Sequence, residues 1–158
     1  MSALILVRHA HRELSDPGAD NGLSKKGREQ SRRLLAYFKR RIGKNERVTL
    51  LSSPKRRCLE TLAPLESYLG CKTLVSDLLV EQKNRESPAA FRARISRALD
   101  GIVASREKSR RLIVLCSHGD WLPIALKRLC GANAELKKGG LAEIEDGSLV
   151  RLLEPTDL

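Results

Sequence analysis

Apolar and polar residues alternate in blocks along this chain, and the blocks have the lengths of buried strands and amphipathic helices. Four short apolar runs rich in Leu, Ile and Val predict strands. They fall at residues 3–8, 48–52, 72–75 and 112–116. The last of these runs is the most apolar, so we expect it near the centre of a sheet that is buried on both faces.

The longer segments between these runs have the periodicity and the end signals of helices. Four helices are predicted, at residues 24–42, 54–69, 88–106 and 120–129. In the first, Leu34, Leu35 and Phe38 form one apolar stripe, and Ser24 has the position of an N-cap. Pro54 is expected to begin the second helix, and Pro64 inside it predicts a kink or break.

The end of the chain has a different pattern, which is typical of a β-hairpin. Asp146 and Gly147 form the dipeptide that a type I′ turn prefers, within residues 140–153. Strand–helix alternation closed by a hairpin predicts a three-layer α/β/α sandwich with a mostly parallel central sheet and the hairpin strand at its edge. We expect residues 1–158 to form a single domain.

Residues suited to phosphoryl chemistry follow three of the predicted strands. Arg8 ends the first strand and His9 follows it, Arg57 comes shortly after the second, and His118 follows the fourth. In a parallel sheet the carboxyl ends of the strands form one edge, where ligands bind. Arginine pairs with phosphate oxygens through two parallel hydrogen bonds, and nearby cations keep a histidine neutral and able to attack phosphorus. This set of residues predicts phosphoryl transfer with no metal and no cofactor.

Four segments resemble, in order, the motifs of the histidine phosphatase superfamily, which also contains the phosphoglycerate mutases. The matching segments are V-R-H-A at 7–10, L-S-K-K-G-R-E-Q at 23–30, S-S-P-K-R-R-C-L-E-T at 52–61 and S-H-G-D at 117–120. The resemblance spans residues 4–130 and implies the same α/β fold. It departs from the family at Ala10, where glycine is usual.

The resemblance implies a role for each matching residue. His9 is expected to accept the phosphoryl group, and Arg8, Arg57 and His118 are expected to hold the phosphate, with His118 also taking part in catalysis. The segment L-L-V-E resembles the family's L-x-E segment and ends at Glu81, which we therefore expect to be the general acid.

Three carboxyl groups are candidates for the general acid. Asp77 and Asp120 remain alternatives to Glu81. A carboxyl that donates a proton needs a raised pKa, which nearby arginines oppose and a bound phosphate dianion favours.

The net charge of +11 is concentrated between residues 25 and 57, where thirteen Lys or Arg face two Glu. Three interpretations remain open for this stretch: a surface for nucleic acid or another acidic partner, a solvated helix face, or a field that attracts an anionic substrate. Nucleic acid is the least favoured, because no aromatic residues alternate with the basic ones.

The remaining composition predicts a cytoplasmic protein that does not enter a membrane. The four cysteines have no C-x-x-C spacing, which favours reduced, mostly buried thiols. The apolar run near the start, residues 3–7, is too short to span a bilayer.

The segment between the third and fourth strands, residues 76–111, is too short for much of a lid over the site. A mutase must exclude water, so hydrolysis is favoured over mutase chemistry. The compact size resembles that of the bacterial protein phosphohistidine phosphatases. The expected substrate is therefore a phosphomonoester or a protein phosphohistidine. A phosphoglycerate-type mutase and a basic module that binds nucleic acid or a protein partner are the alternatives.

Overall fold

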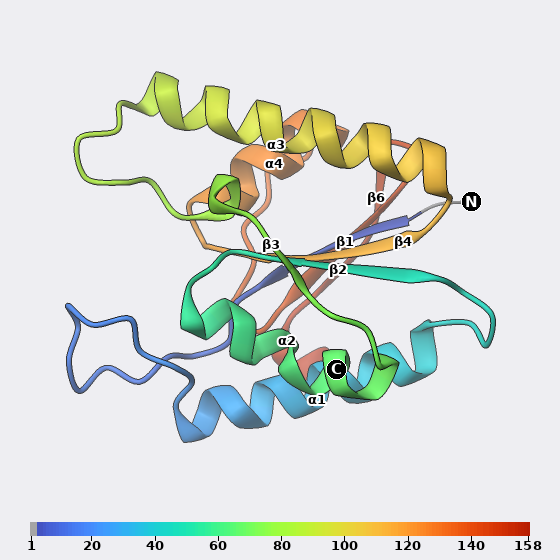
Figure 1. Ribbon diagram of the computed structural model, residues 1–158, viewed down its shortest axis with the longest axis horizontal. Helices are drawn as coiled ribbons and strands as arrows, with labels where there is room; N and C mark the ends of the chain where they lie inside the picture. Colours follow the sequence, from blue (N-terminus) through green and yellow to red (C-terminus); the bar gives the residue numbers. More distant parts are fainter. Residues whose placement is uncertain (1–2) are drawn as a thin grey trace.

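The computed structural model describes residues 3–158, whose strands form a single six-stranded sheet (Figure 1). The strands are β1 (Ala3–Arg8), β2 (Val48–Ser52), β3 (Leu74–Val75), β4 (Leu112–Ser117), β5 (Leu141–Glu145) and β6 (Ser148–Leu153). Their order across the sheet is β3-β2-β4-β1-β5-β6. The first four are parallel, and β5 and β6 form an antiparallel hairpin that joins the sheet at β1.

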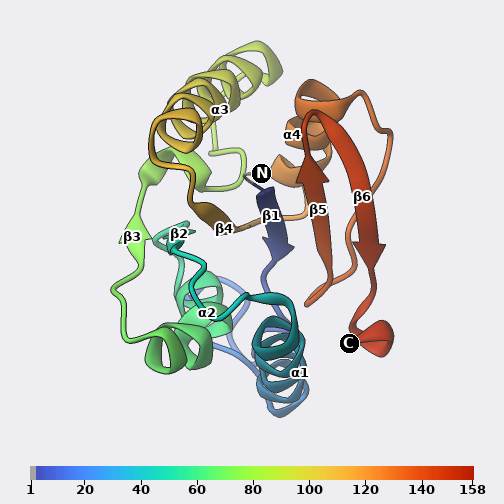
Figure 2. The same ribbon diagram turned by 90° about the vertical axis from the view of Figure 1, so that its right-hand side faces the viewer.

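Helices cover both faces of this sheet. The α-helices are α1 (Lys25–Arg41), α2 (Arg56–Leu69), α3 (Pro88–Ser109) and α4 (Trp121–Cys130), and the short 3-10 helices are η1 (Asp77–Leu79) and η2 (Pro155–Asp157). Figure 2 shows α1 and α2 on one face of the sheet and α3 and α4 on the other. The three-layer α/β/α sandwich predicted from the sequence is confirmed, with β4 inside the sheet as expected.

A single strand supplies side chains to both cores, which explains why its sequence is apolar without interruption. Leu4 and Leu6 of β1 pack in the cluster that includes residues of α3 and α4. Ile5 and Val7 pack in the cluster that includes residues of α1 and α2. Because successive side chains of a strand point to opposite faces, a strand buried on both sides has no polar alternation.

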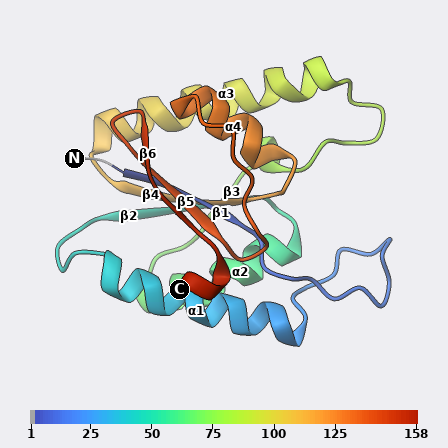
Figure 3. The ribbon, with the colours of Figure 1, turned by 180° about the vertical axis from the view of Figure 1, so that it is seen from behind.

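The hairpin forms at the predicted position. Asp146 and Gly147 have φ values of 48° and 76°, the left-handed conformation that both central residues of a type I′ turn require. The strand β6 lies at the edge of the sheet, and the chain after it ends beside α1 (Figure 3). Within residues 3–158, no helix combines the length and the apolar character that crossing a bilayer would require.

The helix α2 differs from its prediction at two points. It begins at Arg56 rather than at Pro54, because the N–H of Ser53 donates to the carbonyl of Cys116 at 3.1 Å and so extends the pairing of β2 with β4. The helix also continues past Pro64 without the predicted break. Proline removes one backbone hydrogen bond there, and packing of the helix against α1 compensates for the loss.

The third strand is shorter than expected. It spans Leu74–Val75 rather than residues 72–75, because the N–H of Thr73 donates to the carboxylate of Glu66 at 2.7 Å instead of to a strand. The 3-10 helix η1 that follows has no counterpart in the predicted elements. Its side-chain cap is Ser76, whose hydroxyl accepts from the N–H of Leu78.

Candidate active site

The carboxyl ends of the three central parallel strands lie level with one another, which brings their following loops together. Arg8 is opposite Ser117 in the pairing of β1 with β4, and Ser52 is opposite Cys116 in the pairing of β2 with β4. In Figure 1 the loops after β1 and before α3 both project from the left-hand edge of the molecule. The loops that carry the candidate residues therefore leave the sheet at one edge.

The imidazole of His9 is held in one orientation and one tautomer. Its Nδ1 lies 2.9 Å from the carbonyl oxygen of Ala10, and a carbonyl can only accept, so Nδ1 carries the proton. The opposite nitrogen, Nε2, is unprotonated, and its lone pair accepts from Nε of Arg57 at 3.4 Å. Thr61 fixes the loop, because its hydroxyl accepts from the N–H of Ala10 at 2.9 Å.

Burial keeps His9 neutral. The side chain is almost enclosed, and desolvation lowers the pKa of His9 to about 3, with further lowering by the nearby charges of His118, Arg57 and Arg8. The hydrogen bond to Ala10 opposes this shift without cancelling it. The ring is therefore unprotonated at neutral pH.

Arg57 links the two histidines. Its Nη2 lies 3.2 Å from Nδ1 of His118, and since a guanidinium can only donate, the neutral His118 ring carries its proton on Nε2. That nitrogen is 2.9 Å from the hydroxyl of Ser53 and 3.0 Å from a carboxylate oxygen of Glu81. Burial lowers the pKa of His118, but its contacts with Cys58 and Glu81 outweigh burial and raise it.

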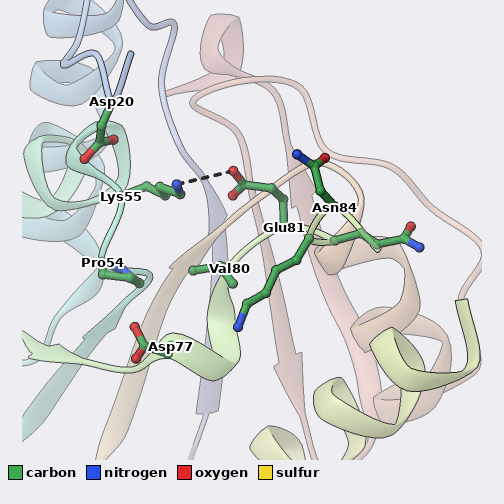
Figure 4. Close-up of a pocket in the computed structure, with 9 residues that line it drawn as sticks. Asp20, Pro54, Lys55, Asp77, Val80, Glu81 and Asn84 are labelled. Carbon is green, nitrogen blue, oxygen red and sulfur yellow. Dashed lines mark ion pairs between the residues drawn. The ribbon is translucent and has the colours of Figure 1, made fainter. Parts of the chain in front are cut away.

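Glu81 closes over the centre of this cluster. One carboxylate oxygen accepts from Nη2 of Arg57 at 3.1 Å, the other faces His118, and Lys55 Nζ lies 4.0 Å away (Figure 4). Burial acts to raise the pKa of Glu81, but His118 and Arg57 outweigh burial and hold it well below its usual range. Glu81 is thus an ionised carboxylate that pairs with the guanidinium of Arg57 and contacts the ring of His118.

Arg8 lies against the second histidine motif, residues 117–120. Its guanidinium packs on Gly119, where an added Cβ would lie 2.7 Å from Cζ. One amino group donates to the carbonyl of Leu136 at 2.9 Å, and burial lowers the pKa of Arg8. Within residues 3–158 its buried Nε has no hydrogen-bond partner, so this N–H is available to a ligand.

Two cavities flank the cluster. One of about 560 Å³ is bordered by Glu81, Asp20, Lys55 and Asp77, with Lys83 beside them (Figure 4). The other, of about 420 Å³, is bordered by Arg8 and by residues of α1 and the loop before β5. Neither wall includes His9 or His118.

The family of the chain follows from comparison with known proteins. The model of the histidine phosphatase superfamily, branch 1, matches residues 4–84 and 76–153, nearly the whole chain. The chain belongs to the histidine phosphatase superfamily. It is an enzyme of the histidine phosphatase type. No curated protein sequence is significantly similar to it.

Solved structures share the fold of this histidine phosphatase along its whole length. The protein histidine phosphatase SixA, complexed with tungstate, is 18% identical, with a TM-score of 0.77 over 98% of this chain and 97% of that one. The α-ribazole phosphatase from Shigella flexneri is 17% identical, with a TM-score of 0.74 over 96% of each chain. A phosphoserine phosphatase mutant from Entamoeba histolytica, in complex with phosphoserine, is 18% identical, with a TM-score of 0.71 over 100% of each chain.

Three further residues near these motifs lie outside the cluster formed by His9, Arg57, His118 and Glu81 in this histidine phosphatase. Arg56, beside Arg57, is exposed and pairs with Glu60. Asp77 borders the larger cavity, and the carboxylate of Asp120 accepts from the N–H of Gln82 at 3.0 Å. Among residues 3–158, no three His, Cys, Asp or Glu side chains gather in a way that could hold a metal ion.

Two polar residues contact the site of this histidine phosphatase without having been predicted there. Ser53 lies against His118, and the hydroxyl of Thr61 donates to the carbonyl of Arg57 at 2.7 Å. Both belong to the matched segment at 52–61, which was the available signal. Ser53 precedes a proline and a helix start, where serine is so often a turn or cap residue that its type alone does not mark it.

Proposed function

We propose that this protein is a metal-independent phosphatase that transfers a phosphoryl group from its substrate to Nε2 of His9 and then to water. The observation that carries this proposal is the neutral imidazole of His9, whose unprotonated Nε2 faces the guanidinium of Arg57. Such a group is a nucleophile placed against a phosphate-binding side chain. The neighbouring cations supply the charge stabilisation that phosphoryl transfer needs.

The first step forms a bond from His9 Nε2 to phosphorus while the bond from phosphorus to the leaving group breaks. Arg57 and Arg8 hold the non-bridging oxygens. The Nε–H of Arg57 already faces His9, and the Nε–H of Arg8 has no hydrogen-bond partner in the described part of the chain. His118 contributes a third donor, helped by its raised pKa. In the second step water attacks phosphorus, the phosphorus–nitrogen bond breaks, and His9 returns to its neutral form.

Glu81 is proposed to be the general acid, and substrate binding itself prepares it for this role. An incoming phosphoryl group displaces its carboxylate from Arg57 and His118, which removes the contacts that lower its pKa. The dianion then faces the carboxylate, repulsion between like charges raises the pKa of Glu81, and Glu81 takes up a proton from solvent. Glu81 gives its proton to the leaving group in the first step and removes one from water in the second.

Hydrolysis rather than mutase chemistry is supported by the short segment over the site. Between β3 and β4 the chain holds only η1, a loop and α3, which leaves little material to exclude water. We propose a phosphomonoester or a protein phosphohistidine as substrate. The similar structures include both a protein histidine phosphatase and a phosphoserine phosphatase, in keeping with either. A cytoplasmic location and the absence of a nucleic-acid partner remain predictions.

Turnover of an aryl phosphate in the presence of a chelator tests the proposal. Arg57→Ala is expected to lower kcat/KM by about a thousandfold, because an arginine that stabilises a transferring phosphoryl group has an effect of that order. The matched control is Arg56→Ala, which removes the same charge from the adjacent exposed position and is expected to retain activity. Loss of activity with chelator, or equal losses in the two variants, would contradict the proposal.

A further inference from the structure

Two buried thiols lie beside the catalytic cluster, and the proposed reaction makes no use of them. Cys58 is in the first turn of α2, Cys116 is near the end of β4, and both are fully buried. The two side chains share a hydrogen bond. All four cysteines of the chain are free thiols, and the other two, Cys71 and Cys130, are partly exposed. Cys58 and Cys116 thus form a pair of thiols where a helix packs on the sheet.

Cys58 has the surroundings of a thiolate. Its Sγ lies 3.6 Å from Nε2 of His118, the nitrogen that carries the proton of that ring and so donates to the sulfur. Burial acts to raise the pKa of Cys58, but the hydrogen bonds from Cys116 and His118 outweigh burial and lower it, helped by the charges of His118 and Arg57. A position in the first turn of a helix also stabilises a thiolate. The thiolate is the form of cysteine that reacts with oxidants.

Cys116 is the protonated partner in this pair. Burial raises the pKa of Cys116, and the hydrogen bond and charge of Cys58 raise it further. Its S–H therefore donates to the sulfur of Cys58 and keeps its proton. Oxidation of a thiolate to a sulfenic acid next to a second thiol leads on to a disulfide, so this arrangement is suited to reversible oxidation.

Building on the proposed function, we propose that Cys58 and Cys116 are a redox switch, which hydrogen peroxide closes into a disulfide that inactivates the phosphatase. First the thiolate of Cys58 attacks one oxygen of the peroxide. A sulfur–oxygen bond forms, the oxygen–oxygen bond breaks, and the leaving oxygen takes a proton from solvent and departs as water. The sulfur of Cys116 then attacks that of Cys58, and the hydroxyl leaves with the proton of Cys116 as a second water. Both sulfurs are oxidised, the peroxide is reduced, and a dithiol reverses the change.

The disulfide inactivates the site because it displaces residues that hold the phosphate. Its two sulfurs are about 2.05 Å apart, much closer than two thiols that share a hydrogen bond, so Cys58 must move toward β4. Arg57 is the preceding residue of the same helical turn, and its donors to His9 and His118 move with it. His118 also loses a contact that raises its pKa. A displacement of about 1 Å in a positioning group can cost about a hundredfold in rate.

Cys58 is reached through the phosphate site. Its sulfur faces the same N–H of His118 that holds the phosphate in the proposed mechanism. Glu81 lies 3.0 Å from that nitrogen and is one-third exposed, and it must move aside for substrate. The same movement admits a molecule as small as hydrogen peroxide. Inorganic phosphate bound in the site therefore protects Cys58 from oxidation.

Hydrogen peroxide treatment of the full chain, followed by peptide mapping without reduction, tests the switch. Wild type is expected to give a cross-linked peptide that joins Cys58 to Cys116, and its aryl phosphate turnover should fall by about tenfold or more. Dithiothreitol should reverse both changes, and inorganic phosphate present during the treatment should slow both. Failure to form this bridge, or a bridged protein with undiminished turnover, would overturn the inference.

Variants at two cysteines assign the effect to the buried pair, each compared with its own untreated rate. Cys58→Ala and the closer match in size, Cys58→Ser, should keep that rate after peroxide. Cys71→Ala should lose activity as wild type does, because Cys71 lies just beyond the opposite end of α2. An undiminished loss in both Cys58 variants, or resistance in Cys71→Ala, would contradict the switch. Turnover by untreated wild type reports on the proposed function alone, and the bridge is mapped whether or not turnover occurs.

Discussion

Replacing Gly119 by alanine tests how Arg8 is positioned, with little change to the rest of the protein. The new Cβ would lie 2.7 Å from Cζ of Arg8, whereas ordinary van der Waals contact begins at 3.4 Å. The guanidinium must therefore move by several tenths of an ångström. Gly119 does not have a left-handed φ, so alanine adds no backbone strain.

This displacement is expected to reduce catalysis more than stability. Misplacing a positioning group by about 1 Å can cost a hundredfold in rate, so we expect kcat/KM to fall by about tenfold to a hundredfold, or about 1.4 to 2.7 kcal/mol. The free energy of unfolding should fall by about 2 kcal/mol at most, through weakening of the hydrogen bond from Arg8 to Leu136. Aryl phosphate kinetics and urea denaturation measure the two effects.

The matched control is Gly101→Ala, in the middle of α3, where an added Cβ meets no atom within 4 Å. It should leave kcat/KM unchanged and stabilise the helix by about 0.5 to 1 kcal/mol. A double-mutant cycle with Arg8→Ala completes the test, since Gly119→Ala should have almost no further effect when the guanidinium is absent. Unchanged kcat/KM in Gly119→Ala, or the same loss in the Arg8→Ala background, would refute the reasoning.

Three further predictions concern other parts of the site. Glu81→Gln should lower kcat/KM by about a hundredfold more for an alkyl phosphate than for nitrophenyl phosphate, because the poor leaving group needs the proton; equal losses, or the leaving-group dependence in Asp77→Asn instead, would contradict its role. Gly27→Ala should destabilise the fold by about 1 to 3 kcal/mol, since its Cβ would overlap the carbonyl oxygen of His11; an unchanged urea midpoint would disprove this. The His9 ring, with its pKa lowered to about 3, should show no proton-NMR titration between about pH 5 and 8; a midpoint near 6.5 would be incompatible with a buried neutral ring.

The sheet and the meeting of the candidate residues could be predicted because both follow from periodicity and chain order. Apolar runs of strand length separated by helices imply parallel strands, and parallel strands end at one edge. Arg8, Arg57 and His118 each stand just beyond such a run. The short strand β3 could not be predicted, because its length depends on a hydrogen bond between Thr73 and Glu66 that no local pattern shows.

The contacts between the site residues were harder to predict than which residues would come together. The contact of Glu81 with both Arg57 and His118 joins residues from three separate segments, and it explains how one carboxylate can be ionised before substrate binds. The cavity beside Arg8 is bordered by Lys138, which no motif marks. Lys138 comes close to Arg8 because the N–H of the next residue, Gly139, donates to the carbonyl of Arg8. Roles of individual residues and the extent of a single domain stay predictions.

Rapid quenching of the reaction with a radiolabelled aryl phosphate tests most directly whether His9 is the nucleophile. Wild type is expected to yield a phosphorylated chain within the first turnover, stable in alkali and labile in acid, with the label mapped by mass spectrometry to His9. The variant His9→Ala should retain the fold and give no labelled chain. Label on another residue, or hydrolysis that continues in His9→Ala, would contradict a mechanism built on this imidazole.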